Sequence, residues 1–239
     1  MDLPENAAPR EHGTTRLKVA TYNLHQWIGR DRRVDIQRIL SVIRSLDADL
    51  IALQEVLLPW AGFTQDDLAR ETGMQVIPGR TLYRGDAEYG NALLTSLPVR
   101  RAWSMDLTVP PFEPRGAICA SLLVGCAAVK VVATHLGMRH RERLYQMEAL
   151  MRELMMPAEL TVMLGDINEW VPRSPVLGRL RAVFGYHQAP KTFPSRFPLL
   201  ALDRILASPP VFERLPCVVR TGAARMASDH LPLNASLRV

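Results

Sequence analysis

The segment GDIN, from Gly165 to Asn168, follows the apolar run TVML and is the stretch from which the fold can be argued. Four related segments occur along the chain, in the order TYNLH (21–25), LQEV (53–56), ATHL (133–136) and SDHLPL (228–233). Each places carboxylate, amide or imidazole groups at one end of a short apolar segment, where a β-strand would carry them to the edge of a sheet. The pattern predicts one polar site assembled from the ends of several strands.

Length and composition agree with a folded core. The chain has 239 residues, of which 48% are hydrophobic and 22% charged, as in ordinary globular proteins. Because the candidate site residues run from Asn23 to His230, one site must draw on nearly the whole sequence. We therefore expect a flexible N-terminal tail, residues 1–16, followed by a single domain, residues 17–239.

The net charge and the cysteines bear on the substrate and the compartment. A net charge of +5 favours a phosphate-bearing substrate, although many soluble proteins are equally basic. Cys119, Cys126 and Cys217 lack metal-ligand spacing and lie in apolar strand-like segments, so we expect buried free thiols in a reducing compartment. Because no apolar segment is long enough to cross a bilayer and the N-terminus lacks the apolar stretch of a signal peptide, the sequence predicts a cytoplasmic protein.

Short apolar segments bounded by Gly, Pro, Asp or Ser have the character of β-strands. They are residues 17–24, 50–56, 74–77, 91–95, 100–107, 117–124, 129–135, 160–165, 202–207, 213–220 and 233–237. Helical patterns are fewer and cover residues 36–43, 65–71, 144–154 and 175–183. Many strands with few helices predict two sheets packed face to face, with the helices outside.

Two pairs of residues suggest metal and water chemistry. Asn23 and Glu55 each end an apolar strand pattern, and a hard cation such as Mg²⁺ prefers a few oxygen ligands of this kind. Asp166 and Asn168, two residues apart after a Gly, would share one side of an extended backbone. Asp can align or deprotonate a water, and Asn can donate to a phosphoryl oxygen. The alternatives are a solvated strand end for Glu55 and ordinary turns for Asn23 and Asp166.

Two histidines add possible acid–base groups. His135 and His230 both occur where strand ends are expected, and Asp203 and Asp229 lie in the last part of the chain. An aspartate bonded to one ring nitrogen fixes the tautomer of an imidazole and raises its basicity. Other catalytic classes lack their required residues, because the sequence contains no GxSxG, HExxH, Walker A or CxxC motif.

Taken together, these motifs with YGNALLTS, PRGAI and LDRILAS resemble the endonuclease/exonuclease/phosphatase superfamily over residues 17–239. The similarity is greatest to compact, stand-alone bacterial members that share the stretch KTFPSRFPLLALDRIL. This resemblance implies the DNase-I-like fold, a four-layer α/β/β/α sandwich of two mostly antiparallel sheets with outer helices.

The resemblance also implies a role for each matching residue. Asn23, Glu55 and Asp229 would bind Mg²⁺ or Mn²⁺. Asp166 would activate the attacking water with Asn168 as its partner, and His230 and Asp203 would form a dyad. His135 would contact the phosphate or assist the leaving group, and Arg115 would bind phosphate. Glu88 would pair with His135, as in the DNase-like branch. Leu202 stands where inositol phosphatases carry a cysteine, which lowers the weight of that branch.

These observations predict a metal-dependent phosphoester hydrolase, and more specifically a phosphodiesterase whose favoured substrate is nucleic acid. The Arg-rich segments 30–33 and 139–143 favour a polyanion, although either could be a solvated face. Phe193, in the Pro-stiffened loop 191–200, is expected to overhang the site and bind substrate. The alternatives are a phosphodiesterase or phosphatase acting on a phospholipid or another small molecule, with residues 193–200 forming an apolar lip, and a catalytically inactive binding module. No protein partner is evident.

Overall fold

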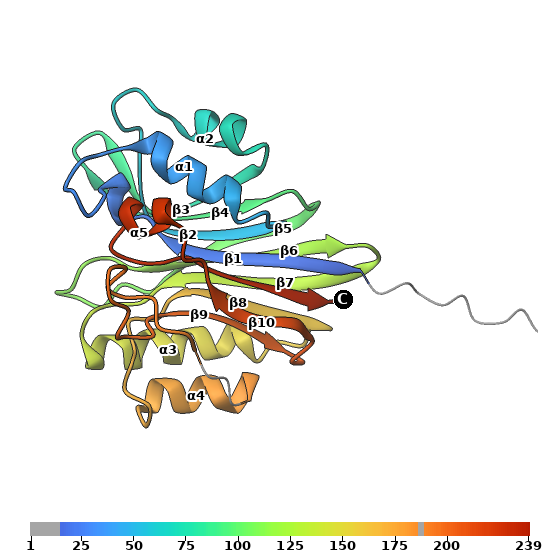
Figure 1. The fold of residues 1–239 in the computed structure, drawn as a ribbon. Helices are drawn as coiled ribbons and strands as arrows, with labels where there is room; N and C mark the ends of the chain where they lie inside the picture. The colour runs from blue at the N-terminus through green and yellow to red at the C-terminus, as the bar shows by residue number, and fades with distance from the viewer. Residues whose placement is uncertain (1–14, 186–188) are drawn as a thin grey trace, which may run out of the picture.

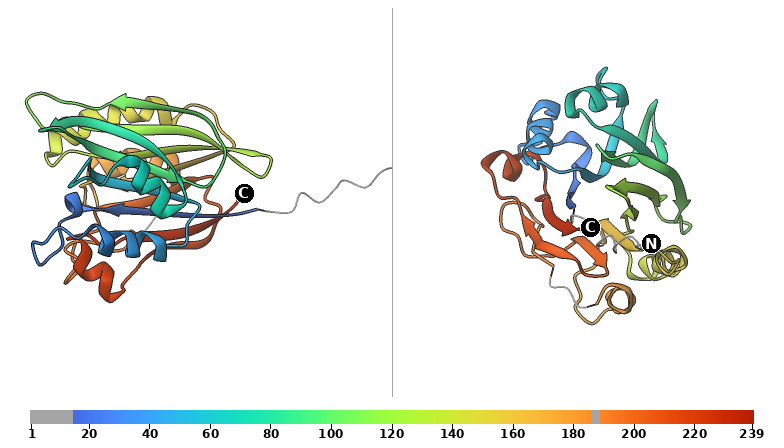
Figure 2. Two further views of the ribbon diagram at one scale, coloured as in Figure 1. Left: turned by 90° about the horizontal axis from the view of Figure 1, so that it is seen from above. Right: turned by 90° about the vertical axis from the view of Figure 1, so that its right-hand side faces the viewer.

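The computed structural model describes residues 15–185 and 189–239. Within them, two β-sheets pack face to face and helices cover both outer surfaces (Figure 1). Helices α1 (Ile36–Ser45), α2 (Gln65–Thr72) and α5 (Gly222–Ala227) lie on one side, and α3 (His140–Leu154) and α4 (Pro175–Phe184) on the other. The expected four-layer α/β/β/α sandwich is confirmed, and the end-on view in Figure 2 shows the layers in cross-section.

The first sheet has six strands in the order β10-β11-β1-β2-β4-β3. Its strands are β1 (Arg16–Asn23), β2 (Leu50–Leu58), β3 (Gln75–Arg84), β4 (Ala87–Thr95), β10 (Phe212–Val218) and β11 (Leu233–Arg238). The pair β1 and β2 is parallel, with α1 as the crossover, and the other pairs are antiparallel. Strands β1 and β2 therefore end at the same edge of the sheet.

The second sheet has five strands in the order β5-β6-β7-β8-β9. Its strands are β5 (Val99–Asp106), β6 (Gly116–Val124), β7 (Ala127–His135), β8 (Leu160–Asp166) and β9 (Asp203–Ser208). Here β7 and β8 form the parallel pair, with α3 as the crossover. Each sheet thus contributes two neighbouring parallel strands whose carboxyl ends carry polar residues.

Three apolar clusters fill the spaces between the four layers. The middle cluster contains residues such as Leu17, Val19, Val131, Leu164 and Ile205 and lies between the sheets. A second packs the first sheet against α1, α2 and α5, and a third packs the other sheet against α3 and α4. Because strand side chains alternate between faces, most strands contribute one set of residues to the middle cluster and the other set to an outer cluster.

The structure adds two short elements to those predicted. A 3-10 helix (His25–Trp27) follows β1, and α5 has the sequence GAARMA, whose small side chains give no helical apolar stripe. Thr221 begins α5 by accepting a hydrogen bond from the Ala224 amide. This helix buries Ala224 and Ala227 in the cluster that also holds α1.

The expectation of three buried thiols was wrong for two of them. All three cysteines are free, but only Cys119 is buried. Cys126 lies in the turn between β6 and β7, and Cys217 lies on β10 at the edge of its sheet, so both are exposed. An apolar strand pattern does not distinguish an edge strand from a central one.

The beginning of the described chain is tied to the end of the fold. Thr15 and Val239 exchange two backbone hydrogen bonds of 2.8 Å, and Arg16 already belongs to β1. Residues 1–14 of the expected tail lie outside the described residues. Among the described helices, none has the length and apolar character needed to span a membrane.

Candidate active site

Side-chain alternation in four strands explains why the polar residues meet. Asn23, His135, Asp166 and Asp203 have the same parity as the apolar residues of their strands that face the other sheet. At this end of the sandwich the inter-sheet layer therefore changes from apolar to polar. All four side chains are buried, which strengthens every electrostatic interaction among them.

Glu55 reaches the same place through an irregularity in β2. By simple alternation the residue facing the other sheet would be Gln54, which bonds to Thr21 in the buried interior. The register of β2 against β4 shifts between Leu53 and Val56, and Glu55 has a φ of 53°. Such a bulge turns a side chain out of the regular pattern. Asn23 Nδ2 consequently donates to Glu55 Oε1 at 3.1 Å.

Asp166 is the centre of the group. The register of β8 places it beside His135 of β7 and Asp203 of β9. Its Oδ2 accepts a hydrogen bond from Asn23 Nδ2 at 3.1 Å, and its Oδ1 accepts one from the Asn168 amide at 2.9 Å. The residue before it must be glycine, because Gly165 has a φ of 140° and a Cβ there would lie 1.9 Å from the Thr134 carbonyl oxygen.

Asp203 and His230 form the expected hydrogen-bonded pair. His230 Nδ1 lies 2.9 Å from Asp203 Oδ2, and its Nε2 lies 3.7 Å from Asp166 Oδ2. Ser228 Oγ accepts a bond from the His230 amide and donates to the carbonyl of Asn23, which ties this segment to β1. The imidazole therefore lies between two buried carboxylates, with Nε2 directed to Asp166.

The carboxylates and the imidazole perturb one another's pKa values. Burial and the neighbouring charge of Asp203 raise the pKa of Asp166 to about 6, although His230 and hydrogen bonds oppose the rise. Burial alone would lower the pKa of His230, but the charges of Asp203, Asp166 and Asp229 outweigh it and raise the value to about 10. At neutral pH His230 therefore carries a positive charge, and it lies beside the Asp166 carboxylate, which can take up a proton.

His135 has the opposite character. Burial lowers its pKa well below the usual value, and the charges of Arg115 and His230 lower it further. Arg115 Nη1 can only donate, and it lies 3.0 Å from His135 Nδ1, so the neutral ring carries its proton on Nε2 and makes no hydrogen bond with the Asn168 amide group, which donates to the Leu136 carbonyl. That Nε2 lies 3.1 Å from Asn168 Nδ2 and 3.6 Å from Asp166 Oδ2. The expected pairing of His135 with Glu88 is wrong, because Glu88 instead bonds to Arg80 at 3.3 Å.

The remaining predicted residues lie around this network. Asp229 Oδ1 is 3.3 Å from Ser228 Oγ and 3.8 Å from His25 Nδ1. The Phe193 ring is half-buried and packs against the His230 ring, with 4.9 Å between centroids. Arg115 also pairs with Glu113, with 3.2 Å between Nη2 and Oε1. The structure therefore brings all ten predicted site residues to one end of the sandwich.

Two buried hydroxyl residues of the site were not predicted. Thr192 Oγ1 donates to Asp203 Oδ2, the oxygen that also contacts His230. Ser195 donates from its amide to the Asp229 carbonyl and from Oγ to the Ser228 carbonyl, both at 2.7 Å. Both residues are completely buried. Their position in the segment KTFPSRFP was visible in the sequence, but nothing there distinguishes a buried Thr or Ser from an exposed one.

The donor set suits a hard divalent cation. Glu55, Asp166 and Asp203 bring three carboxylates into a small volume, and the charge of Asp203 raises the pKa of Asp166. One Asp203 oxygen, Oδ1, is buried without a hydrogen-bond partner among the described residues. Asn23 and Glu55 offer oxygen ligands, and the carboxylates of Asp166 and Asp203 have oxygens within 4.8 Å of each other. Oxygen-rich, negatively charged sites of this kind fit Mg²⁺ or Mn²⁺.

Comparison with known proteins identifies the class to which this fold and site belong. The model of the endonuclease/exonuclease/phosphatase family matches residues 21–230, and the chain is a member of that family. Members of this family are phosphoester hydrolases that generally depend on divalent metal ions.

Individual relatives cover nearly the whole chain. The protein named YbhP from Escherichia coli K12 is 28% identical over 245 residues, covering 93% of this chain and 96% of YbhP. A family member from Beutenbergia cavernae has a similar structure, with a TM-score of 0.74 and 21% identity over 94% of this chain and 72% of its own. ANGEL2, described as a 2',3'-cyclic phosphatase in complex with adenosine-2',3'-vanadate, gives a TM-score of 0.73 and 17% identity, covering 95% of this chain and 97% of ANGEL2.

Proposed function

We propose that this protein is a divalent-metal-dependent phosphodiesterase that cleaves a P–O bond of a nucleic acid or nucleotide with an activated water. The observation that carries the proposal is the position of Asp166. Its carboxylate is bonded to Asn23, next to Glu55, and is 3.7 Å from the imidazole of the Asp203–His230 pair. A proton acceptor thus lies between a set of metal ligands and a charged hydrogen-bond donor.

The residues divide the chemistry between them. Asn23, Glu55 and Asp229 would hold Mg²⁺ or Mn²⁺, which supplies charge neutralisation at the phosphate oxygens when bound. Asp166, with a pKa of about 6, is largely ionised at neutral pH and can accept the proton of the attacking water. The Asn168 backbone amide donates a hydrogen bond to Asp166 and keeps the carboxylate oriented. Asn168 is itself held in place because its Nδ2 donates to the Leu136 carbonyl.

The two histidines act in different protonation states. His230, with a pKa of about 10, presents a charged Nε2–H that stabilises negative charge developing on phosphoryl oxygen. Neutral His135, held by Arg115, offers its Nε2 proton to a phosphate or leaving-group oxygen. Arg115 itself is buried and bonded to Glu113 and His135, so it acts on phosphate mainly through His135.

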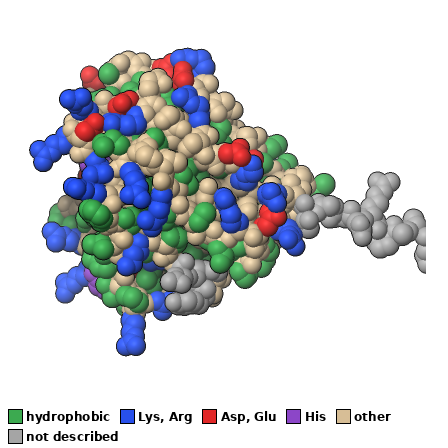
Figure 3. Space-filling view, viewed as in Figure 1, with side chains coloured by type: hydrophobic (Ala, Val, Ile, Leu, Met, Phe, Trp, Pro, Cys, Tyr) green, Lys and Arg blue, Asp and Glu red, His purple; other side chains and the backbone are tan. Residues whose placement is uncertain are grey.

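A polyanionic substrate is supported by the surface near the site. Figure 3 shows Lys and Arg side chains, with few Asp or Glu, along the edge where β1 leads toward α1 and where α5 lies. Arg30 Nη1 and Ser195 Oγ both donate to the Arg225 carbonyl. Arg196, the residue after Ser195, is exposed. These arginines therefore surround the segment that holds His230, and they favour a backbone of several phosphates. ANGEL2, with its adenosine-2',3'-vanadate complex, adds support from a similar fold.

A phospholipid or another small phosphodiester is the second candidate, favoured by the tip of the loop 191–200. Phe197 is 67% exposed and Leu199 is 64% exposed, and two apolar side chains beside an Arg form a lip that lipid chains could contact. A catalytically inactive binding module is less well supported, because a scaffold has no need for a buried carboxylate with a raised pKa, as Asp166 has.

Activity measurements with a matched pair of variants test the proposal. We expect the purified protein to hydrolyse bis-nitrophenyl phosphate with Mg²⁺ or Mn²⁺ and to lose activity in chelator. Glu55→Gln should weaken metal binding in calorimetry and reduce kcat/KM by at least about tenfold, with little change in Tm. Glu88→Gln removes an exposed carboxylate from the neighbouring strand β4 and should change neither quantity. Undiminished Mg²⁺ affinity in Glu55→Gln would contradict the assignment.

A substrate panel then separates the two candidates. Single-stranded RNA, DNA, nucleoside 2',3'-cyclic phosphates and phosphatidylcholine vesicles are compared at equal metal concentration. The nucleic-acid proposal predicts cleavage that weakens as salt rises, because arginine–phosphate contacts are screened. Preferential hydrolysis of vesicles, with little salt dependence, would favour the phospholipid alternative instead.

A further inference from the structure

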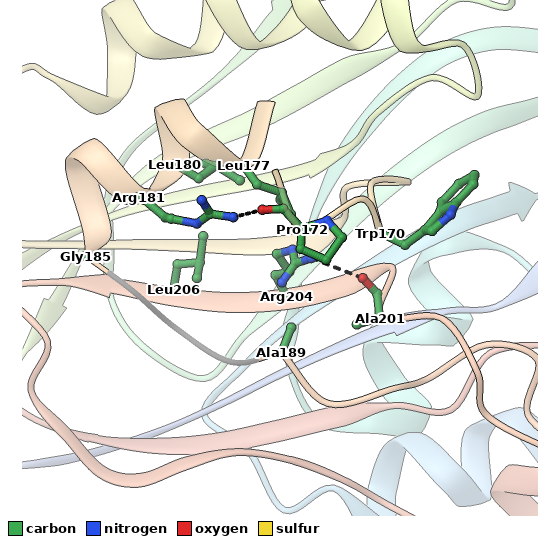
Figure 4. Close-up of a pocket in the computed structure, with 10 residues that line it drawn as sticks. All are labelled: Trp170, Pro172, Leu177, Leu180, Arg181, Gly185, Ala189, Ala201, Arg204 and Leu206. Carbon is green, nitrogen blue, oxygen red and sulfur yellow. Dashed lines mark hydrogen bonds between the residues drawn. The ribbon is translucent and has the colours of Figure 1, made fainter. Parts of the chain in front are cut away.

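A pocket of about 300 Å³ lies between α4 and β9, on the outer side of the second sheet (Figure 4). Alternation along β9 separates it from the active site. Asp203 and Ile205 face the inter-sheet layer, whereas Arg204 and Leu206 face α4. The pocket is therefore a distinct space that shares a strand with the active site.

The wall of the pocket is mostly apolar. Leu177 and Leu180 of α4, Leu206 of β9 and the side chains of Trp170 and Pro172 contribute to it, as Figure 4 shows. A space of this size, bounded by leucine, proline and an aromatic ring, suits a small apolar or aromatic group. Burial of such a group would be favoured by the removal of its surface from water.

Two arginines in this wall lack the partners that buried arginines normally have. Arg115 and Arg143, the other buried arginines, each pair with a glutamate at 3.2 Å. The described residues place no carboxylate oxygen within 4.0 Å of Arg204, although it is only 8% exposed. Its Nη2 donates to the backbone carbonyls of Glu169 and Ala201.

Arg181 adds a second positive charge to the same pocket. It is half-buried, donates to the Pro172 carbonyl, and likewise has no carboxylate partner among the described residues. The charges of Asp203 and Glu169 favour the charged form of Arg204, and the charge of Arg181 opposes it more weakly. Because no carboxylate oxygen of the described residues lies within 4.0 Å of Arg204 or Arg181, an anion in the cavity would form the direct ion pairs that both guanidinium groups lack.

From the two arginines without carboxylate partners and the apolar wall, we infer that this pocket binds a small organic anion. Its carboxylate or phosphate would contact Arg204 and Arg181, and its apolar part would pack against Leu177, Leu180 and Leu206. Neither an inorganic ion nor a neutral ring satisfies both halves of the pocket. The inference does not depend on the hydrolase activity, because none of these residues belongs to the metal or proton-transfer group.

Calorimetry with the full chain in chelator tests this inference, since no metal then attracts anions to the active site. The probes are phenylacetate, phenylphosphonate, sodium sulfate and benzyl alcohol. We expect a Kd on the order of 1 mM for one or both aromatic anions, as befits about ten non-hydrogen atoms. Sulfate and benzyl alcohol should bind at least about tenfold more weakly. Tighter binding of phenylphosphonate or of phenylacetate identifies a phosphate or a carboxylate as the preferred anion.

Variants locate the site. Arg204→Gln and Arg181→Met should each weaken binding by about tenfold or more, because each removes charge-assisted hydrogen bonds. Ala201→Trp, which fills the pocket without removing charge, should abolish binding. Arg179→Met is the matched control, since Arg179 is on the same helix but pairs with Glu148 at 3.2 Å. If Arg204→Gln does not fold, as judged by circular dichroism, Arg181→Met and Ala201→Trp still decide the question.

Three results would overturn the inference. These are no binding of either aromatic anion, equal binding of sulfate, and binding that survives both Ala201→Trp and Arg181→Met. A failure of these probes to bind would not bear on the proposed phosphodiesterase activity, because that activity depends on Glu55 and Asp166 and is measured with metal.

Discussion

Asp203 illustrates how one side chain organises others. Its Oδ2 contacts His230 Nδ1 and accepts a bond from Thr192, and its charge raises the pKa values of both His230 and Asp166. Asp203 touches neither the expected metal ligands Asn23 and Glu55 nor, in the proposed mechanism, the phosphate. It sets the protonation and the orientation of the groups that do.

This arrangement predicts non-additive loss of activity. Asp203→Ala and His230→Ala should each lower kcat by roughly 10²- to 10⁴-fold, the usual contribution of a positioned acid–base group. The double variant should be no worse than the more damaged single variant, because residues that act as one unit fail together. Asp47→Ala removes a surface carboxylate paired with Lys18 and should have no effect. Losses that multiply in the double variant would mean that the two residues act independently.

At the residue scale, the sequence identified the polar groups but not their charge states. A histidine at a strand end looks the same whether its neighbour is Arg115, as for His135, or Asp203, as for His230. The predicted pairing of Glu88 with His135 was wrong for the same reason, because spacing along the chain does not show which side chains on distant strands come into contact. Long-range contacts decide pKa values, and they follow from topology.

Among the elements, the segment from Thr192 to Leu200 connects several parts of the site. Its backbone bonds pair Thr192 with Leu231 and Ser195 with Asp229, and its buried hydroxyls hold Asp203 and Ser228. The loop therefore fixes the SDH segment from one side while β1 fixes it from the other through Ser228. Its exposed tip is left free to meet a substrate.

Phe193 tests whether this loop also contributes to specificity. Its ring packs against His230, so Phe193→Ala should raise KM for the preferred nucleic-acid or lipid substrate by on the order of tenfold, through lost stacking or burial. Hydrolysis of bis-nitrophenyl phosphate should remain nearly unchanged. For a nucleic-acid substrate, Phe197→Ala is the comparison, because that exposed ring lies in the same loop and no ring contact joins it to His230. Equal loss on both substrates with a lowered Tm would show that the Phe193 ring serves only packing.

The elements themselves were largely predictable. Strands in the middle of a sandwich carry apolar residues at alternate positions on both faces, and all the strand-like segments correspond to strands. The short helices after β1 and before β11 escaped prediction, because His25–Trp27 and Gly222–Ala227 are stabilised by packing and capping rather than by periodicity. The bulge at Glu55 also escaped, since its cause is the pairing with β4.

For the molecule as a whole, the buried charges predict how stability depends on pH. The folded-state pKa of His230, about 10, lies above the unfolded value near 6.5. Its contribution is therefore fully present below pH 6.5 and is lost as pH rises through 10. In chelator, the free energy of unfolding should fall across this window by at most about 1.4 kcal/mol per pH unit from this group.

Denaturant unfolding between pH 6.5 and 10 measures the effect, with His230→Gln as the reference. Most other groups that titrate in this range are common to both proteins, so the difference between the two curves reports His230 together with its effect on Asp166, whose pKa it lowers. The gap should narrow as pH rises. A constant difference would mean that His230 has similar pKa values in the folded and unfolded chains.

The sandwich could be expected as a whole because its motifs occur in a fixed order along the chain. The existence of the anion pocket could not, since it depends on which arginines find carboxylates. Arg143 and Arg204 have the same charge, yet only Arg143 pairs with the Glu169 carboxylate, whereas Arg204 donates to the Glu169 backbone carbonyl. Composition fixes how many charges there are, and the packing of α4 on β9 decides which remain unpaired.

The position of β1 has a consequence for biosynthesis. It pairs on one side with β2, which follows within a few dozen residues, and on the other with β11, which begins at Leu233. At about 5 to 20 residues per second, roughly 10 to 40 s of translation separate the two partners. Through that interval a growing chain keeps one edge of β1 open to wrong pairing. His230 is synthesised just before this closing strand, so the proposed active site and the protected edge of β1 are completed at nearly the same time.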